Sequence, residues 1–361
     1  MKRKIFTLVL LFLLTLGGGI AMLLGQTAVS LSERRELAQW SSLPKTNILS
    51  GRFMDKVEDT AMDQFPFRDA FRTLKSVYLY YAIGQLDNNG IYIFNGQAEK
   101  LDYPLRGDSI KNVINRINNI QSTYLNGTDV TTYFAIIPDK NYFLAADLGY
   151  PTMDYAQMET LLADGLSAEF IDIASVLSAE SYYKTDPHWR QEALLPVAQK
   201  LCEQMGVPFA AESFTEVSAG ELVGAYAGQS ALPLTPDPLL YLTNEALENC
   251  RVRDLSTGKM VPLYDLEGAA GADAYDLYMG GAAPIQQISN PSASSDKELV
   301  IFRDSFGSSV APLLAGSYSK ITLVDIRYMS SALIRQYITF TDQDVLFLYS
   351  TLVLNHSESL K

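Results

Sequence analysis

The sequence predicts an α/β fold: a parallel sheet flanked by helices, with a β-rich insertion and an apolar helix at the N-terminus. Two observations predict the sheet. From about residue 101, short apolar runs alternate with amphipathic stretches, and the alternation resumes after residue 297. The insertion is predicted because residues 207–297 are instead rich in Gly, Ala, Pro and Tyr. A chain of 361 residues with 48% hydrophobic content can bury such a core.

The first 26 residues predict a membrane anchor. Three basic residues at positions 2–4 precede an uncharged run over residues 5–24, which at about 1.5 Å per residue gives roughly 30 Å of helix. The basic cluster is expected to stay in the cytoplasm, so that one helix inserted in the membrane leaves the main domain extracytoplasmic. The alternative is a cleaved signal peptide and a secreted domain, although the apolar region of a signal runs to only about 7 to 15 residues.

Residues 27–100 are expected to form a spacer and a helical region. The spacer, residues 27–50, is polar and lacks a sustained period. Residues 51–84 then carry apolar side chains at helical spacing on either side of Phe65-Pro66, which predicts two helices with a turn between them. The stretch NNGIYIFNG predicts a short strand between two turns.

Residues 101–361 are expected to form the α/β domain, interrupted by the inserted lobe at about 207–297. The expected strands lie within residues 130–140, 169–178, 298–304, 320–327 and 344–351, and the insertion adds candidates at 238–243, 251–255 and 260–265. The expected helices lie within residues 110–125, 153–167, 190–206, 307–318 and 330–338.

Composition excludes several kinds of partner and site. The net charge of −13 and the pI near 4.7 oppose binding to a phosphate backbone, so nucleic acid is excluded as a partner. With two His, two Cys and no Cys-x-x-Cys pair, we expect no metal site built from these residues and no cofactor. Cys202 and Cys250 are open to two interpretations: a disulfide outside the cytoplasm, or a buried free thiol at Cys202.

Ser305 is the candidate nucleophile. The strand predicted over residues 298–304 ends just before it, and a helix is predicted to begin near Gly307. Open α/β sheets bind ligands at the carboxyl ends of their strands, where the first amides of the next helix can stabilise an oxyanion. The alternative is that Asp304 or Ser305 simply caps the helix.

The stretch YYKTDPHWR supplies a candidate base and its partner. Pro187 favours extended geometry before it, so Asp186 and His188 can face the same side, with one ring nitrogen left for a serine. The alternative is a solvated turn ahead of a helix. The other histidine, His356, lies in the polar C-terminal tail, where disorder is the default expectation.

Four motifs occur along the chain in this order: DQFPFRDAFRTLKS, NNGIYIFNG, YYKTDPHW and FRDSFGSSVAPLLAGSYSKITLVDIRY. From about residue 30 to the C-terminus the chain resembles the bacterial DHHW protein family, SGNH hydrolase-like proteins related to the periplasmic alginate O-acetyltransferases. The resemblance implies a serine-dependent acyltransferase or esterase with catalytic Ser305, His188 and Asp186. Two departures stand out: Pro187 replaces the family's usual His, and Arg303 replaces the Gly of the GDS motif.

The oxyanion and substrate-binding groups are not identified by any motif. Candidates are the Ser305 backbone amide, Arg303 and Lys140, and a buried ion pair is the alternative interpretation for both cations. The sequence thus predicts transfer or hydrolysis of an acyl group, expected to be acetyl, on a cell-surface or exported polysaccharide. A transferase there would need a membrane protein to deliver the acyl group. The alternative is a catalytically inactive, membrane-tethered protein for glycan binding or cell-envelope assembly.

Overall fold

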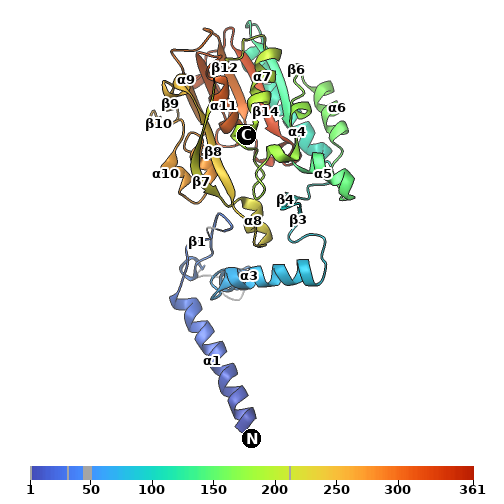
Figure 1. The fold of residues 1–361 in the computed structure, drawn as a ribbon, viewed down its shortest axis with the longest axis vertical. Helices are drawn as coiled ribbons and strands as arrows, with labels where there is room; N and C mark the ends of the chain where they lie inside the picture. The colour runs from blue at the N-terminus through green and yellow to red at the C-terminus, as the bar shows by residue number, and fades with distance from the viewer. Residues whose placement is uncertain (1, 31, 44–50, 211–212) are drawn as a thin grey trace. The chain divides into compact units, whose positions relative to one another are not determined.

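The computed structural model describes residues 2–30, 32–43, 51–210 and 213–361. Residues 44–50 of the predicted spacer and residues 211–212 of the predicted insertion lie outside them. The chain forms two compact units, one of residues 1–91 with 225–235 and one of residues 92–224 with 236–361 (Figure 1).

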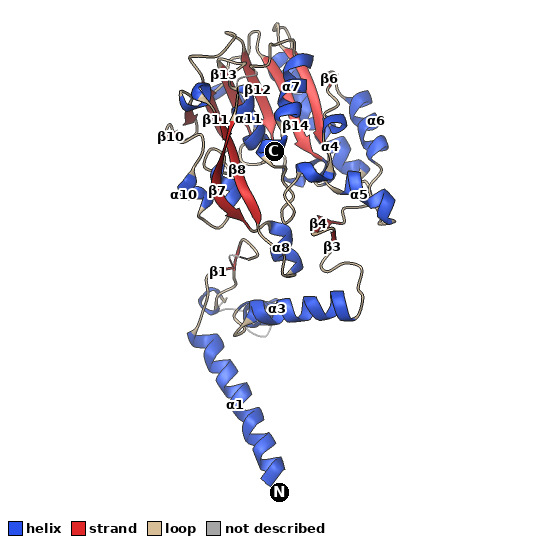
Figure 2. Ribbon diagram, in the orientation of Figure 1, coloured by secondary structure: helices blue, strands red, loops and turns tan. Residues whose placement is uncertain are grey.

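The larger unit is built on a mixed eight-stranded sheet in the order β10-β9-β11-β13-β12-β14-β5-β6 (Figure 2). The strands from β13 to β6 in this order are parallel, whereas β11, β9 and β10 continue the sheet in antiparallel pairing. The strand bounds are β5 Thr131–Ile137, β6 Glu169–Phe170, β9 Arg251–Asp254, β10 Met260–Val261, β11 Ile285–Ser289, β12 Glu298–Arg303, β13 Lys320–Val324 and β14 Asp344–Ser350.

Helices cover both faces of this sheet because the central strands are apolar on both sides. Ile301 and Leu348 pack in one cluster with residues of α7 and α11, whereas Phe302 and Phe347 pack in the other with residues of α4 and α6. The helix bounds are α4 Gly107–Ile120, α5 Asn141–Leu148, α6 Tyr155–Gly165, α7 Leu195–Gln204, α9 Glu245–Glu248, α10 Leu266–Ala269, α11 Gly307–Leu314 and α12 Thr351–Asn355.

The predicted α/β fold with a parallel core and flanking helices is confirmed, but the separate β-rich lobe is wrong in part. Strands β9, β10 and β11 from that segment extend the main sheet at its edge. Two hairpins stand apart from the sheet: β7 Thr215–Leu222 with β8 Asp237–Thr243, and β3 Ile91–Phe94 with β4 Gln97–Lys100. The helix predicted over 330–338 is a 3₁₀ helix, Ser331–Gln336, and the strand predicted over 169–178 shrinks to β6.

The smaller unit contains the N-terminal helices. Its elements are α1 Lys2–Leu24, β1 Val29–Ser30, β2 Arg35–Glu36, α2 Gly51–Asp63, α3 Arg68–Val77 and α8 Ala225–Ser230. The two helices predicted around Phe65-Pro66 are present as α2 and α3. Among the described residues no helix is both long enough and apolar enough to cross a membrane, so the predicted membrane-spanning helix over residues 1–26 is not supported.

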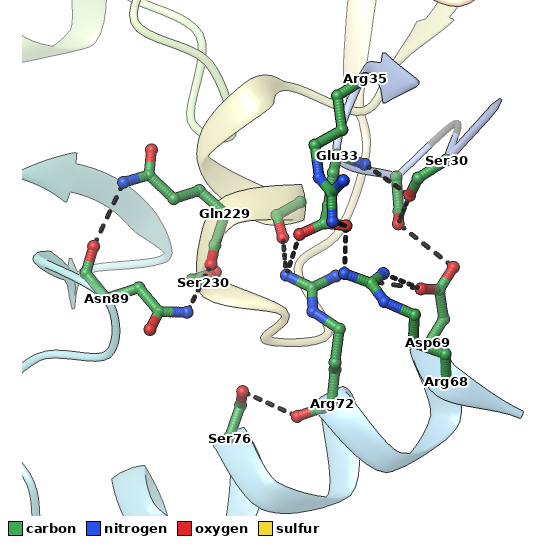
Figure 3. Close-up of polar contacts among 12 residues, drawn as sticks. Ser30, Glu33, Arg35, Arg68, Asp69, Arg72, Ser76, Asn89, Gln229 and Ser230 are labelled. Carbon is green, nitrogen blue, oxygen red and sulfur yellow. Dashed lines mark hydrogen bonds and ion pairs between the residues drawn. The ribbon is translucent and has the colours of Figure 1, made fainter. Parts of the chain in front are cut away.

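Polar side chains on one side of α3 hold this unit together (Figure 3). Arg72 pairs with Glu33 at 3.1 Å and donates to the carbonyl of Gly228 at 2.9 Å, and Arg68 also pairs with Glu33 at 2.6 Å. Gly228 must be glycine, because a Cβ there would lie 1.6 Å from the carbonyl oxygen of Ser32. These contacts fasten residues 225–235 to a segment far away in the sequence.

Candidate active site

Ser305 lies at the carboxyl edge of the sheet, in the turn between the buried strand β12 and helix α11. The turn is held by Asp304, whose carboxylate accepts from the Phe306 amide at 3.1 Å and from the amide and hydroxyl of Ser350 at 2.8 and 2.7 Å. Within the described ranges, no side chain caps the N-terminus of α11 by a hydrogen bond. The Ser305 hydroxyl, half-buried, is therefore not used as the helix cap that was the alternative interpretation.

Asp186 and His188 lie on a short loop. An isolated antiparallel β-bridge between Tyr182 and Trp189 joins the ends of the loop. The Tyr183 amide also donates to the His188 carbonyl at 3.0 Å. Oδ1 of Asp186 is 2.6 Å from the ring Nδ1 of His188 and accepts from the His188 backbone amide at 3.1 Å. The carboxylate is fully buried, so it orients the ring from the protein side.

Residues in and next to the β7–β8 hairpin hold this loop in place. The Asp237 carboxylate accepts from the amides of Lys184 and Thr185, both at 2.8 Å, and from the Thr185 hydroxyl at 2.7 Å. Gly224 allows the close approach, because a Cβ there would lie 2.1 Å from the Thr185 carbonyl oxygen and 2.5 Å from Cβ of Asp186. The loop that carries the aspartate and the histidine is thus held rigidly by residues of a distant segment.

The two halves of the site meet at His188. Its Nε2 lies 2.7 Å from Oγ of Ser305, 117 positions away in the sequence. When Nδ1 donates to Asp186, Nε2 accepts from the serine hydroxyl, which is the arrangement a general base requires. The structure therefore brings together the three residues singled out as catalytic candidates in a continuous hydrogen-bonded chain.

Aromatic side chains hold the imidazole from its faces. The Tyr275 ring stacks on the His188 ring at 3.9 Å between centroids and 12° between planes, and Phe306 lies 4.7 Å away. The Tyr275 hydroxyl donates to Ser309 at 2.7 Å, and the Trp189 indole donates to the same oxygen at 2.8 Å. Sequence reasoning missed Tyr275, Ser309, Asp237 and Gly224, since no local pattern distinguishes them from other residues of their type.

Arg303 and Lys140 each lie in a buried ion pair, which was the alternative to a role in binding the oxyanion or substrate. Arg303 is 3.7 Å from Asp325 and donates to Gln286 at 3.3 Å, and burial lowers the pKa of its guanidinium. Lys140 is 3.6 Å from Glu99. Arg303 also donates to the Asp304 carbonyl, and Lys140 donates to the carbonyls of Ala98 and Tyr183. The described residues also offer no acceptor to the Ser305 backbone amide, which leaves that amide available to an oxyanion.

His356 does not lie in a disordered tail, so that expectation is wrong. It follows helix α12, and its Nε2 lies 2.8 Å from Asp102 while its Nδ1 lies 2.9 Å from Arg106. Both ring nitrogens are engaged in a contact that packs the C-terminus on the domain. In the part of the chain that the structure describes, His188 is therefore the histidine paired with a serine.

The structure also gives the state of the cysteines and of possible metal ligands. Cys202 and Cys250 are free thiols, and burial raises the pKa of each to about 11. Over the described ranges, no group of three or more His, Cys, Asp or Glu side chains is placed to hold a metal ion. The hydrogen-bonded chain of Asp186, His188 and Ser305 offers nucleophilic chemistry at the serine, with proton transfer through the histidine.

Comparison with known proteins supports the fold that the sequence motifs predicted. No protein-family model and no curated protein sequence matches the chain. Among solved structures, a DHHW family protein from Eubacterium siraeum is 20% identical, with a TM-score of 0.59 over 76% of this chain and 95% of its own. Bacillus cereus PatB1, solved also with a sulfonyl adduct, is 20% identical, with TM-scores of 0.56 alone and 0.55 with the adduct, over 73% of this chain. The chain therefore shares its fold with a DHHW family protein.

Proposed function

We propose that the protein is a serine-dependent acyltransferase or esterase that acts on a glycan, with Ser305, His188 and Asp186 as its catalytic triad. The observation that carries the proposal is the hydrogen-bonded chain from Asp186 through His188 to Ser305, with distances of 2.6 and 2.7 Å. A catalytically inactive glycan-binding protein has no need of this alignment, and a separation above about 8 Å would have favoured it.

In the proposed mechanism each residue takes one step. Nε2 of His188 removes the hydroxyl proton as Oγ of Ser305 attacks the carbonyl carbon of the acyl donor. The negative charge that develops on the carbonyl oxygen faces the Ser305 amide and the start of α11. When the intermediate collapses, His188 returns the proton to the departing alkoxide. Asp186 keeps the ring in the required tautomer and stabilises the imidazolium.

The acyl-enzyme then reacts with a second hydroxyl. His188 removes the proton from a sugar hydroxyl in a transferase or from water in an esterase, and the acyl group leaves Ser305. A small acyl group, acetyl, fits the resemblance to the O-acetyltransferases noted from the motifs. The sulfonyl adduct of PatB1 supports a nucleophilic centre in this fold, because sulfonyl groups become attached where a nucleophile attacks the sulfur.

The proposed place of action is outside the cytoplasm. The basic residues at positions 2–4 and the uncharged run after them support export of the domain. A glycan acylated there has no access to cytosolic acyl donors, so the proposal includes a membrane protein that delivers the acyl group.

The test compares the wild-type protein with Ser305→Ala. We expect the wild type to hydrolyse 4-nitrophenyl acetate and to gain one sulfonyl group by mass at Ser305 when treated with phenylmethanesulfonyl fluoride. Ser305→Ala should lose the label and at least about a thousandfold in kcat/KM. The matched control is Ser308→Ala, at a serine in the first turn of α11. Equal hydrolysis and labelling of wild type and Ser305→Ala would refute the proposal.

A further inference from the structure

Lys140 is a buried cation beneath the loop that carries Asp186 and His188. It lies three residues beyond the end of β5 and is 1% exposed. Its ammonium group donates to the backbone carbonyl of Tyr183 at 3.0 Å and to that of Ala98. The Ala98 amide in turn donates to the carbonyl of Lys184 at 2.7 Å. Lys140 thus joins strand β4 to the first residues of the loop.

Three buried carboxylates act on the charge of this cation: Glu99, Asp186 and Asp237, which are 1%, 0% and 3% exposed. Glu99 lies 3.6 Å from the ammonium group, and burial raises the pKa of this carboxyl to about 8. Burial also lowers the pKa of Lys140, while the charges of Glu99, Asp186 and Asp237 favour its protonated form. By the same interaction, the ammonium group of Lys140 favours the ionised form of Asp186.

The imidazole that accepts the serine proton is neutral, and in that form His188 offers Asp186 no positive charge. A buried carboxylate without a positive neighbour is strongly disfavoured relative to one with such a neighbour. Lys140 supplies that neighbour from beneath the loop. It also donates to Tyr183, the residue whose amide closes the loop on the His188 carbonyl.

We propose that Lys140 is a positioning residue: it keeps Asp186 ionised and fixes the loop, so that the His188 ring stays aligned with Ser305. This inference rests on the proposed function. It gives Lys140 a role other than contact with the substrate or oxyanion, because the ammonium group donates to the backbone carbonyls of Ala98 and Tyr183.

The test measures the rate constant for sulfonylation of Ser305 by phenylmethanesulfonyl fluoride between pH 5 and 9. In this reaction Oγ of Ser305 bonds to sulfur, fluoride leaves, and His188 takes the proton. The groups that contact His188 are Asp186, Ser305, Tyr275 and Phe306. The rate therefore reports directly on the charge state and alignment of the imidazole, independently of any glycan substrate.

The variant is Lys140→Met, which keeps the length of the side chain and removes its charge. Without the positive charge of Lys140, the protonated form of the His188 ring is less strongly disfavoured. We therefore expect the acid limb of the pH profile to move to higher pH by about one unit. The plateau rate should fall about tenfold as the loop loosens. The matched control, Lys111→Met, removes an exposed lysine that pairs with Asp108 and should reproduce the wild-type profile.

A second variant keeps the test decisive if the single substitution prevents folding. The double variant combines Lys140→Met with Glu99→Leu. It replaces the buried pair of Lys140 and Glu99 by two apolar side chains, a change that is often neutral for stability. If Lys140 acts on Asp186, the acid limb of the double variant stays shifted. Restoration of the wild-type midpoint would show that Lys140 only offsets Glu99, which overturns the inference.

The remaining outcomes separate the inference from the proposed function. If the wild-type protein is not sulfonylated at Ser305, the proposed function fails and the inference fails with it. If the wild type reacts and Lys140→Met keeps its midpoint, the proposed function stands and the role of Lys140 is refuted.

Discussion

Replacing Asp186 by asparagine separates the two contributions of its carboxylate. Oδ1 takes part in two hydrogen bonds, one with Nδ1 of the His188 ring at 2.6 Å and one from the His188 backbone amide at 3.1 Å. A backbone amide can only donate, so it holds an asparagine with the side-chain oxygen toward His188. That oxygen still accepts from the ring, so the tautomer with Nε2 open to Ser305 is kept while the negative charge is lost.

The expected loss in Asp186→Asn is therefore electrostatic alone. A neighbouring opposite charge changes proton affinity by about one to three pKa units, and two units at about 1.4 kcal/mol each give about 2.7 kcal/mol. This corresponds to a fall of about a hundredfold in kcat/KM. Asp186→Ala loses the orientation of the ring as well, and its activity should fall about ten-thousandfold, the size of effect known for a triad with the wrong tautomer.

The assay is kcat/KM for 4-nitrophenyl acetate, with circular dichroism melts to show that each variant folds. Asp296→Asn, at an exposed aspartate of the same unit, is the matched control. If Asp186→Asn loses as much activity as Asp186→Ala, the backbone amide does not fix the side chain and the reasoning is refuted. Full activity in both variants would remove Asp186 from the mechanism.

Two further predictions concern the surroundings of the loop. Tyr275→Phe keeps the ring stacked on His188 and removes only the hydroxyl that donates to Ser309, so kcat/KM should stay within about threefold of the wild-type value. Tyr275→Ala removes the stacked ring, which is worth about 1.5 kcal/mol for an aromatic pair, so kcat/KM should fall about tenfold. Equal losses in the two variants would refute the stacking role. The folded state raises the pKa of Glu99 from its ordinary 4.5 to about 8, so between these pH values it holds a proton that the unfolded chain releases, and stability falls as pH rises. Urea unfolding at pH 5 and 8 should show that Glu99→Gln flattens this fall by a few kcal/mol, and parallel pH dependence in both proteins would contradict it.

The part of the site that could be predicted consists of residues whose function is visible in their own segment. The apolar run that ends before Ser305 identifies a buried strand, and the next residues identify a helix start, so the serine is placed at the sheet edge by local pattern. Asp186 and His188 are two positions apart, so their pairing also needs no knowledge of the fold. The approach of these two segments depends on the sheet. It was predicted by setting His356 aside as part of a disordered tail, although the structure places that histidine against Asp102 and Arg106.

The parts that could not be predicted come largely from residues 207–297. Tyr275 is one of 21 tyrosines, and nothing near it in the sequence indicates that it stacks on an imidazole. Strand β11 has glutamines at two of its five positions, and Gln286 is buried only because it donates to Met279 and accepts from Arg303. A strand satisfied by such long-range partners lacks the apolar run that marks β12, so its place in the sheet was missed.

Arg303 shows why a departure from a motif has to be interpreted in three dimensions. A large cation two residues before the nucleophile seems, from sequence, either to crowd the site or to bind substrate. Arg303 is instead the last residue of β12, and Asp325 directly follows the neighbouring parallel strand β13. Their ion pair links the ends of the two strands inside the domain. Arg327 also binds Asp325, at 2.6 Å, so the carboxylate is held from both sides. The guanidinium thus braces the strand end beneath Ser305, and the chemistry proposed for the serine does not require a small residue at position 303.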